Sequence, residues 1–186
     1  MKKRWIAAAA AVVLLLGCVA GGSLAWLIDR TQAKVNTFTV GNIEIALEET
    51  AADYKMVPGC TIAKDPTVSV TAESEACWLF VKVTESDNLD DFIAYTMADG
   101  WTALTGVDGV YYRQVTQGAG ADGFAVLADD QVMVKNTVTK DMMGGLTAQT
   151  YPQLTFTAYA VQYYDGSDNG QGHMEPAEAW ALIANP

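Results

Sequence analysis

The chain contains a single histidine, and its surroundings limit the catalysis that is open to it. His173 stands in a glycine-rich stretch near the C-terminus. Catalytic zinc sites use several ligands, as in H-E-x-x-H, and there is no second imidazole here. A Ser/His/Asp triad would need His173, and no serine lies in a G-x-S-x-G turn. A Cys/His pair would need the same histidine to fold back onto a cysteine. The sequence therefore predicts no catalytic residues, no cofactor and no enzymatic activity.

A stretch just before this histidine imitates the start of a calcium-binding loop. Asp165, Ser167 and Asn169 place oxygen atoms at alternate positions, and Gly170 follows them. Hard cations use this spacing because alternate side chains converge as such a loop turns. The twelfth position, however, is Pro176 rather than glutamate. Asp165, Ser167 and Asn169 are the candidate metal ligands, and a solvated turn without a metal is the favoured interpretation.

The cysteines raise a question of pairing. If the N-terminal segment is removed after export, Cys60 and Cys77 remain of the three cysteines. A disulfide between them would close a loop of about 17 residues and stabilise the fold by roughly 3 kcal/mol. Two buried free thiols are the alternative, and the sequence leaves both open. Cys18 ends a Leu-Leu-Gly-Cys stretch that is close to a lipoprotein box. The residues after it stay apolar, so loss of Cys18 with the signal is favoured.

The N-terminal segment has the form of an export signal. Three basic residues at positions 2–4 precede an apolar helix predicted over 5–28. This order directs a chain to export and keeps its basic end in the cytoplasm. Ser23 and Ala25 are small residues at the −3 and −1 positions of a cut before Trp26. An uncleaved anchor is the alternative, since the run is long enough to cross a bilayer. The predicted organisation is a signal peptide at 1–25, a spacer at 26–34 and one domain at 35–186.

The charge of the exported part excludes some partners. The chain has 11 basic and 22 acidic residues and a net charge of −11. Cleavage after Ala25 removes basic residues and no acidic ones, so the mature chain is more acidic still. Such a charge opposes binding to nucleic acid or anionic lipid, and it favours solubility or a cationic partner. We expect contact with a membrane only through the signal segment.

Short stretches of alternating apolar and polar residues predict β-strands along the rest of the chain. Val35–Leu47 alternates and changes phase at Gly41, which indicates a bulge. Cys77–Glu85 is apolar on both sides at its start, so it should lie in the middle of a sheet. The other predicted strands are 67–71, 101–104, 110–115, 124–127, 131–138 and 153–164.

Turn residues separate these strands. Pro58-Gly59 predicts a turn, and Asp99-Gly100, Asp108-Gly109 and Asp122-Gly123 predict hairpins. Short strands about ten residues apart, with such turns and no helix–strand alternation, are typical of an all-β antiparallel sandwich.

The C-terminal residues predict one short helix. Pro176 stands near its first position, which suits proline. The side of the helix predicted to pack consists of Ala177, Trp180, Ala181 and Ile183 or Ala184. Among the strands, the adjacent pairs Tyr111-Tyr112 and Tyr163-Tyr164 should each point one ring outward. Packing of these rings is favoured over stacking on sugars.

The stretch GGSLAWLIDRTQAKVNTFTVGNIEIALEE resembles the SipW-type signal peptide and first strand of the TasA/camelysin family of exported surface proteins. The resemblance rests on the glycine-rich signal end, Ala25, Asp29 and Thr37-Phe38-x-x-Gly41 before an alternating strand. VPGCTIAKDPTVSV followed by WLFVKV is similar to a hairpin of the family, and LTFTAYAVQ is similar to its last core strand. The part from Asp87 to Lys140 is individual to this chain.

The resemblance implies a jelly-roll-like β-sandwich and release by a SipW-type signal peptidase. It also implies a place in the extracellular fibres or matrix of Gram-positive bacteria, so the protein is expected to be secreted. Camelysin-type members are described as metallopeptidases, but this sequence lacks a pair of metal-binding histidines. That activity is therefore not transferred, and only the cleavage region around Ala25 and Trp26 is.

A mode of assembly follows, as a hypothesis, from the expected mature N-terminus. A cut before Trp26 frees an apolar end, followed by polar residues up to Lys34 and a strand from Val35. Such a tail could add as a strand to an open sheet edge of a neighbouring copy, and head-to-tail repetition gives filaments. The expected partners are the signal peptidase, further copies of the chain and other matrix or wall components. A surface-displayed module that binds a sugar, a cation or a host protein is the alternative.

Overall fold

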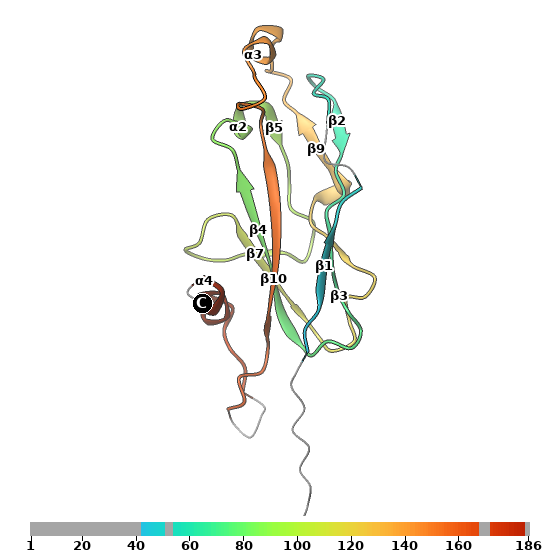
Figure 1. Ribbon diagram of the computed structural model, residues 1–186, viewed down its shortest axis with the longest axis vertical. Helices are drawn as coiled ribbons and strands as arrows, with labels where there is room; N and C mark the ends of the chain where they lie inside the picture. Colours follow the sequence, from blue (N-terminus) through green and yellow to red (C-terminus); the bar gives the residue numbers. More distant parts are fainter. Residues whose placement is uncertain (1–41, 51–53, 168–171, 185–186) are drawn as a thin grey trace, which may run out of the picture. The chain divides into compact units, whose positions relative to one another are not determined.

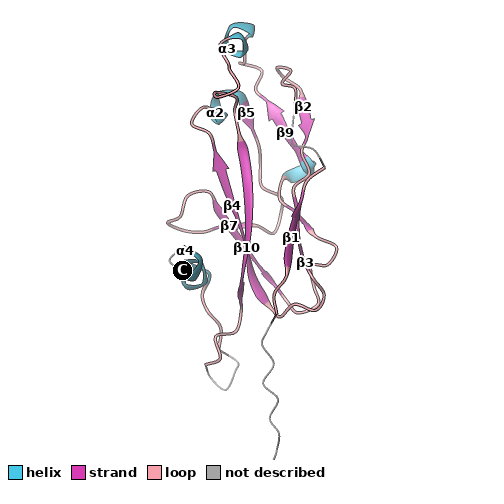
Figure 2. Ribbon diagram, viewed as in Figure 1, coloured by secondary structure: helices cyan, strands magenta, loops and turns pink. Residues whose placement is uncertain are grey.

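Antiparallel β-strands make up most of the structure, with a few short helices (Figures 1 and 2). The computed structural model describes residues 42–50, 54–167 and 172–184. From Gly41 onward the chain belongs to one compact unit. The first sheet has the strand order β10-β4-β7-β6, and all its pairs are antiparallel. Its strands are β4 (Cys77–Glu85), β6 (Thr102–Ala103), β7 (Val110–Val115) and β10 (Leu154–Gln162).

Two smaller sheets continue one another and form a second layer. Their orders are β1-β3-β8 and β2-β9-β5. At the join, Lys64 N donates to Asp130 O (2.8 Å) and Val126 N donates to Pro66 O (2.9 Å). These bonds pair 61–70 with 124–134 across the gap between the two sheets. The strands are β1 (Ile45–Glu48), β2 (Thr61–Ala63), β3 (Thr67–Val70), β5 (Ile93–Ala94), β8 (Phe124–Ala125) and β9 (Gln131–Val134).

A kink in the second layer separates β8 from β9. The short 3-10 helix η1 (Ala128–Asp130) lies there, and Asp129 and Asp130 have positive φ angles of 54° and 50°. Aspartate tolerates this left-handed backbone better than most residues. Extra residues at the kink shift the pairing with the neighbouring strand, as in a bulge. The predicted strand 124–127 ends early before this kink, and the predicted strand 131–138 ends early because a turn follows at 136–137.

The inner faces of both layers share one hydrophobic core. Every second residue of each long strand points into it, as the alternation predicted. The prediction that Cys77–Glu85 is a central strand is confirmed, because β4 pairs with β10 on one side and β7 on the other. The core side chains from the strands include Val68, Val70, Leu79, Val81, Val83, Val132, Val134 and Phe156.

The outer face of the first sheet is partly covered by the C-terminal helix. The predicted helix is present as α4 (Pro176–Ala184). Trp180 is buried, with its ring centroid 5.4 Å from that of Phe80 and 5.5 Å from that of Tyr159. The packed side consists of Pro176, Ala179, Trp180 and Ile183, whereas Ala177 and Ala181 are exposed. The prediction for those two alanines was wrong, because the buried stripe runs through the residue before Trp180.

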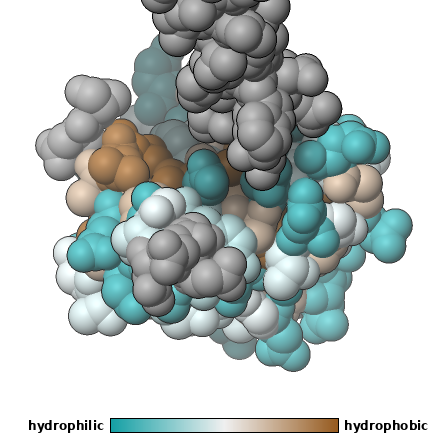
Figure 3. Space-filling view, turned by 90° about the horizontal axis from the view of Figure 1, so that it is seen from below, coloured by the Kyte–Doolittle hydropathy of each residue, from teal (hydrophilic) through white to brown (hydrophobic). Residues whose placement is uncertain are grey.

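The lower end of the described domain is largely polar. Seen from below in Figure 3, most of the coloured side chains are hydrophilic or neutral, with one hydrophobic group at the upper left.

Only one of the three Asp-Gly dipeptides closes a hairpin. Asp108-Gly109 joins β6 to β7, which pair with each other. Asp99-Gly100 and Asp122-Gly123 are turns too, but the strands on either side of each lie in different sheets. The hairpin predictions there were wrong, since a turn dipeptide does not specify which strand the chain pairs with next. Pro58-Gly59 is a turn, as predicted, with Gly59 at φ 76°.

Several short elements were not predicted, among them η1, and the first strand is also shorter than predicted. β2, β5 and α3 (Lys140–Gly144) have two to five residues each, too few for a periodic pattern to show. Within the predicted strand Val35–Leu47, residues 35–41 lie outside the described residues, and 42–44 have no regular secondary structure. The predicted bulge at Gly41 also lies outside them. α2 (Leu89–Phe92) occupies the polar loop that follows β4.

Candidate functional site

A groove opens where the first strand of the second layer ends. β1 pairs with β3 and does not reach β2, so in the described part of the chain β2 has a strand partner only on its β9 side. A cavity of about 940 Å³ lies beside this uncovered edge. Leu154 and Thr155, at the beginning of β10, line it from the other layer. We call this cavity the β2–β10 groove.

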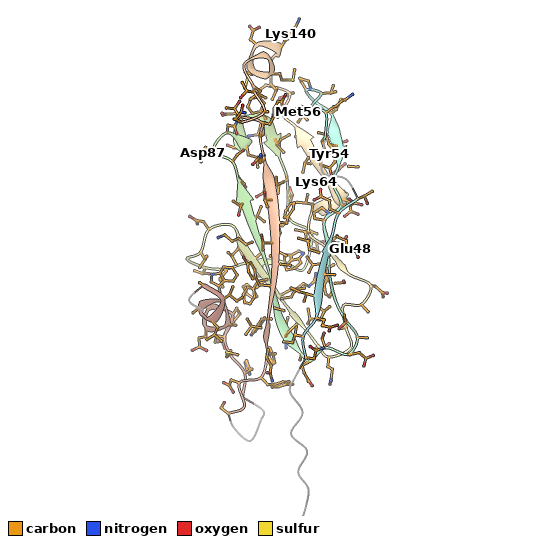
Figure 4. The ribbon with its side chains drawn as sticks, in the orientation of Figure 1. Glu48, Tyr54, Met56, Lys64, Asp87 and Lys140 are labelled. Carbon is orange, nitrogen blue, oxygen red and sulfur yellow. The ribbon has the colours of Figure 1, made fainter. Side chains whose placement is uncertain are left out.

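Most of the side chains that line the β2–β10 groove are apolar and come from distant parts of the sequence. Several of them also pack against the shared core, so the groove is a place where the core reaches the surface. On one side, Tyr54, Met56 and Lys64 lie beside β2 and β9 (Figure 4). The apolar lining includes Ile62, Leu89, Ile93, Val132, Met143 and Leu146.

The β10 edge carries backbone groups that no other strand in the described part of the chain uses. Ser86 N donates to Gln153 O (2.9 Å), which fixes the alternation of the β10–β4 ladder. In an antiparallel ladder, every second residue directs its N–H and C=O groups away from the partner strand. β10 is the last strand of its sheet in the described part of the chain. The outward groups belong to Leu154, which lines the groove, and to Phe156, Ala158, Ala160 and Gln162, which lie farther along β10.

The β2 edge is open in the same way over a shorter length. Val134 N donates to Cys60 O (2.9 Å), and Lys64 N donates to Asp130 O (2.8 Å). The alternation between these bonds directs the backbone groups of Thr61 and Ala63 away from β9. The groove is thus bordered by one open edge from each layer.

The one cation that is buried beside the groove has a partner. Lys64 is 7% exposed and forms an ion pair with Glu49. Its Nζ atom lies 5.1 Å from the centroid of the Tyr54 ring and 5.4 Å from that of Phe156. Tyr54 Oη donates to Glu49 Oε1 (2.8 Å). Burial, and then this hydrogen bond, raise the pKa of the Tyr54 phenol. The charge of Lys64 is therefore balanced without an added ligand.

A second set of hydrogen bonds fixes the segment that follows β1. Thr50 N donates to Asp65 Oδ1 (3.0 Å), and Thr50 Oγ1 donates to Asp65 Oδ2 (2.5 Å). The bond from the hydroxyl, and then the one from the backbone, lower the pKa of the Asp65 carboxyl. Together with the Glu49–Lys64 pair, these bonds hold the end of β1 against the link between β2 and β3.

The predicted calcium-like stretch forms a local turn. Asp165 Oδ1 accepts a hydrogen bond from Ser167 N (2.8 Å), and hydrogen bonds from Ser167 lower the pKa of the Asp165 carboxyl. Gly172 N donates to Ser167 O (3.0 Å), which closes the turn. Asn169 lies outside the described residues. Within those residues, no group of three or more His, Cys, Asp or Glu side chains is arranged to hold a metal ion.

The histidine packs against aromatic rings. His173 is stacked on Tyr163, with ring centroids 5.0 Å apart and planes at 3°. Its Nε2 atom lies 4.0 Å from Glu175 Oε1. Trp78 also contacts Tyr163, and its Nε1 atom donates to Met174 O (2.8 Å). His173 therefore helps to hold the segment that leads into α4.

Both cysteines in the described residues are free thiols. Cys60 is exposed and Cys77 is buried. Cys77 begins the nine-residue strand β4, whereas Cys60 lies beside Val134, near the level at which β4 ends. A nine-residue strand is about 27 Å long, far beyond the reach of a disulfide. Of the two interpretations left open by the sequence, the structure agrees with free thiols, although only one of them is buried.

The predicted cleavage residues Ser23, Ala25 and Trp26 lie outside the described residues, as do Cys18, the signal helix and the spacer. None of the helices in the described part of the chain is long and apolar enough to span a bilayer.

Sequence reasoning missed the groove, because its residues carry no motif. Met56, Ile62, Met143 and Leu146 are single apolar residues in short or irregular segments. The available signal was weak: a Lys-Asp-Met-Met-Gly-Gly-Leu stretch with apolar residues three apart after a possible cap. Thr139 does cap α3, since its Oγ1 atom accepts from Met142 N (3.2 Å).

Comparisons with known proteins gave no match for this chain, whether with family models, with curated proteins or with solved structures.

Proposed function

We propose that this protein is an exported structural component of an extracellular fibre or matrix that assembles by strand addition. The observation that carries the proposal is the β2–β10 groove, which is lined mainly by apolar residues but exposes polar and apolar atoms about equally. In the described part of the chain it is bordered by an unpaired strand edge from each layer. In this proposal the two layers form a jelly-roll-like sandwich, and the groove is the place where that sandwich accepts a strand from outside.

The incoming strand is the mature N-terminal tail of a neighbouring copy, residues 26–34. Its first three residues, Trp26, Leu27 and Ile28, are apolar and would be released by the cut after Ala25. Main-chain bonds to the outward groups of β10 or β2 would hold such a strand, and alternate side chains would fill the groove. Each copy then gives one tail and receives one, which makes an open chain of copies.

A non-catalytic role is part of the proposal. The chain's one histidine packs against Tyr163 and lies near Glu175. The resemblance of the N-terminal segment to the TasA/camelysin family points in the same direction, since that family contributes to surface fibres. The SipW-type signal peptidase would be the partner in export, and other matrix or wall components would be partners outside the cell.

A second candidate function is a surface-displayed binding module. The observation that favours it is the same groove, because pockets for small ligands have volumes of about 300–1,000 Å³. Filaments of the secreted protein in electron microscopy would favour the structural role. Saturable binding of a sugar or a cation by a protein that stays monomeric would favour the module.

The test is removal of the tail from the mature protein. A chain that begins at Trp26 is expected to form filaments, and a chain that begins at Val35 is expected to stay monomeric. The control carries nine glycine and serine residues in place of 26–34, which keeps the length and removes the apolar side chains. Analytical ultracentrifugation and electron microscopy give the readout. Equal polymerisation of all three proteins would sink the proposal.

A further inference from the structure

The side of the sandwich opposite the groove is built differently. There the first sheet ends in β6, and the second layer ends in β8 and β5; each of these strands has two residues. Pairing with β3 leaves the Ala125 carbonyl of β8 pointing outward. Trp101, just before β6, donates its Nε1–H to that carbonyl (2.8 Å). A side chain thus occupies a backbone acceptor that an added strand would need.

Arg113 of β7 points between the two layers on this same side. Its guanidinium carbon lies 3.8 Å from the centroid of the Phe124 ring and 5.3 Å from that of Trp101. A Cβ atom at Gly100 would come within 2.8 Å of Arg113 Nη2, so the glycine makes room for the guanidinium. The cation is held by aromatic rings rather than by a carboxylate.

No acceptor pairs with this guanidinium among the residues that the structure describes. Its Nε atom is buried and lacks a hydrogen bond, and burial lowers the pKa of the Arg113 side chain. The chain has 22 acidic residues, so carboxylates are abundant even though none of the described ones pairs with Arg113. Since Arg113 is only partly buried, water can still reach the rest of the guanidinium. Lys64 differs in this respect, because its charge meets Glu49.

We infer that Arg113, together with Trp101, closes this side of the sandwich to strand addition, so that assembly uses only the groove side. A strand added here would cover the guanidinium and remove its water without supplying a counter-charge, which is costly. Inward-pointing charges and very short edge strands are known means of protecting sheet edges from pairing. The inference rests on the proposed function, and it adds that assembly has one direction.

The test removes the charge in the protein that lacks 26–34, which the proposed function expects to be monomeric. Arg113→Met keeps a long, unbranched side chain between the rings and removes the charge. We expect the Met variant to self-associate at least about tenfold more tightly than its parent by sedimentation equilibrium. Arg113→Lys keeps the charge and should remain monomeric. Gln114→Met adds the same side chain on the exposed face and should also remain monomeric.

Circular dichroism and urea unfolding establish that each variant is folded. If the Met variant does not fold, Arg113→Gln, which is neutral and polar, takes its place with the same expectation. A folded neutral variant that stays monomeric overturns the inference, and so does a Gln114 variant that associates equally well. The proposed function fails separately, if the parent without 26–34 already polymerises.

Discussion

Lys64 and Arg113 are both cationic side chains, but we infer that they have opposite effects on strand addition. Both point between the layers, Lys64 from the link that follows β2 and Arg113 from β7. Lys64 is paired with Glu49, so the apolar surface beside it can be covered without leaving a buried charge unpaired. Arg113 is held by Phe124 and Trp101 and has no carboxylate partner in the described residues. The presence or absence of one carboxylate thus separates an edge that can accept a strand from one that resists it.

The two cysteines give a test at the same scale. Burial raises the pKa of the Cys77 thiol above its ordinary value, to about 11, and the thiolate is the reactive form. In the folded chain starting at Trp26, iodoacetamide at pH 8 should label Cys60 and leave Cys77 unlabelled. Both should be labelled in urea without a reductant. Peptide mass spectrometry gives the readout, and an unlabelled, linked pair in urea would show a disulfide instead.

The raised pKa of Cys77 also determines the direction in which this thiol changes the stability of the fold as the pH rises. The folded state favours the neutral thiol, which stabilises the fold. This stabilisation is fully present below pH 9 and is lost as the pH rises through about 11. Alkaline unfolding of the wild type is therefore expected to be eased in that window by Cys77.

Among the elements, α4 lies outside the shared core. It packs on the outer face of the first sheet through Trp180, away from the shared core. The helix has nine residues, too few to be stable alone in water, so its formation relies on this packing.

Trp180→Ala should therefore cost about 3 kcal/mol of unfolding free energy, the usual loss for a buried tryptophan. Leu182→Ala is the matched control, because Leu182 is 58% exposed on the same helix. Its effect should be within about 0.5 kcal/mol. Urea unfolding followed by circular dichroism measures both. Similar losses for the two variants would mean that α4 does not pack as described.

The strands of the first sheet were predicted best where they are long. β4 and β7 have the predicted bounds, and β10 lies inside the predicted 153–164. β2, β5 and β8 have two or three residues and owe their conformation to partners elsewhere in the chain. Local patterns are weak in such short pieces, and tertiary pairing decides them.

At the scale of the described domain, the two sides of the sandwich are unequal. One side has a cavity of about 940 Å³ and the long outward edge of β10. The other side has strands of two residues, the Trp101–Ala125 hydrogen bond and Arg113. If assembly proceeds by strand addition, this inequality makes it head-to-tail.

The β10 edge can be tested with proline, which lacks an N–H group and is tolerated in a sheet only where that group faces outward. Ala158→Pro removes an outward N–H, so the folded monomer should persist while assembly weakens by about tenfold or more. Thr157→Pro is the matched control: Thr157 pairs with Lys82 on β4, so it should destabilise the monomer itself. Undiminished assembly of a folded Ala158→Pro protein would place the incoming strand elsewhere.

The sequence by itself determined the all-β class, the central strand and the closing helix, because the local spacing of apolar residues indicates each of them. The acidic charge follows from composition alone, and the export signal remains a prediction from the order of residues in the N-terminal segment. The tertiary structure decided which strands pair, that Cys60 and Cys77 are far apart, and that Tyr54, Ile62, Met143 and Leu154 line one groove. The physical reason is that an edge becomes open or closed only when the neighbours of each strand are known. Those neighbours come from parts of the chain that no local pattern connects.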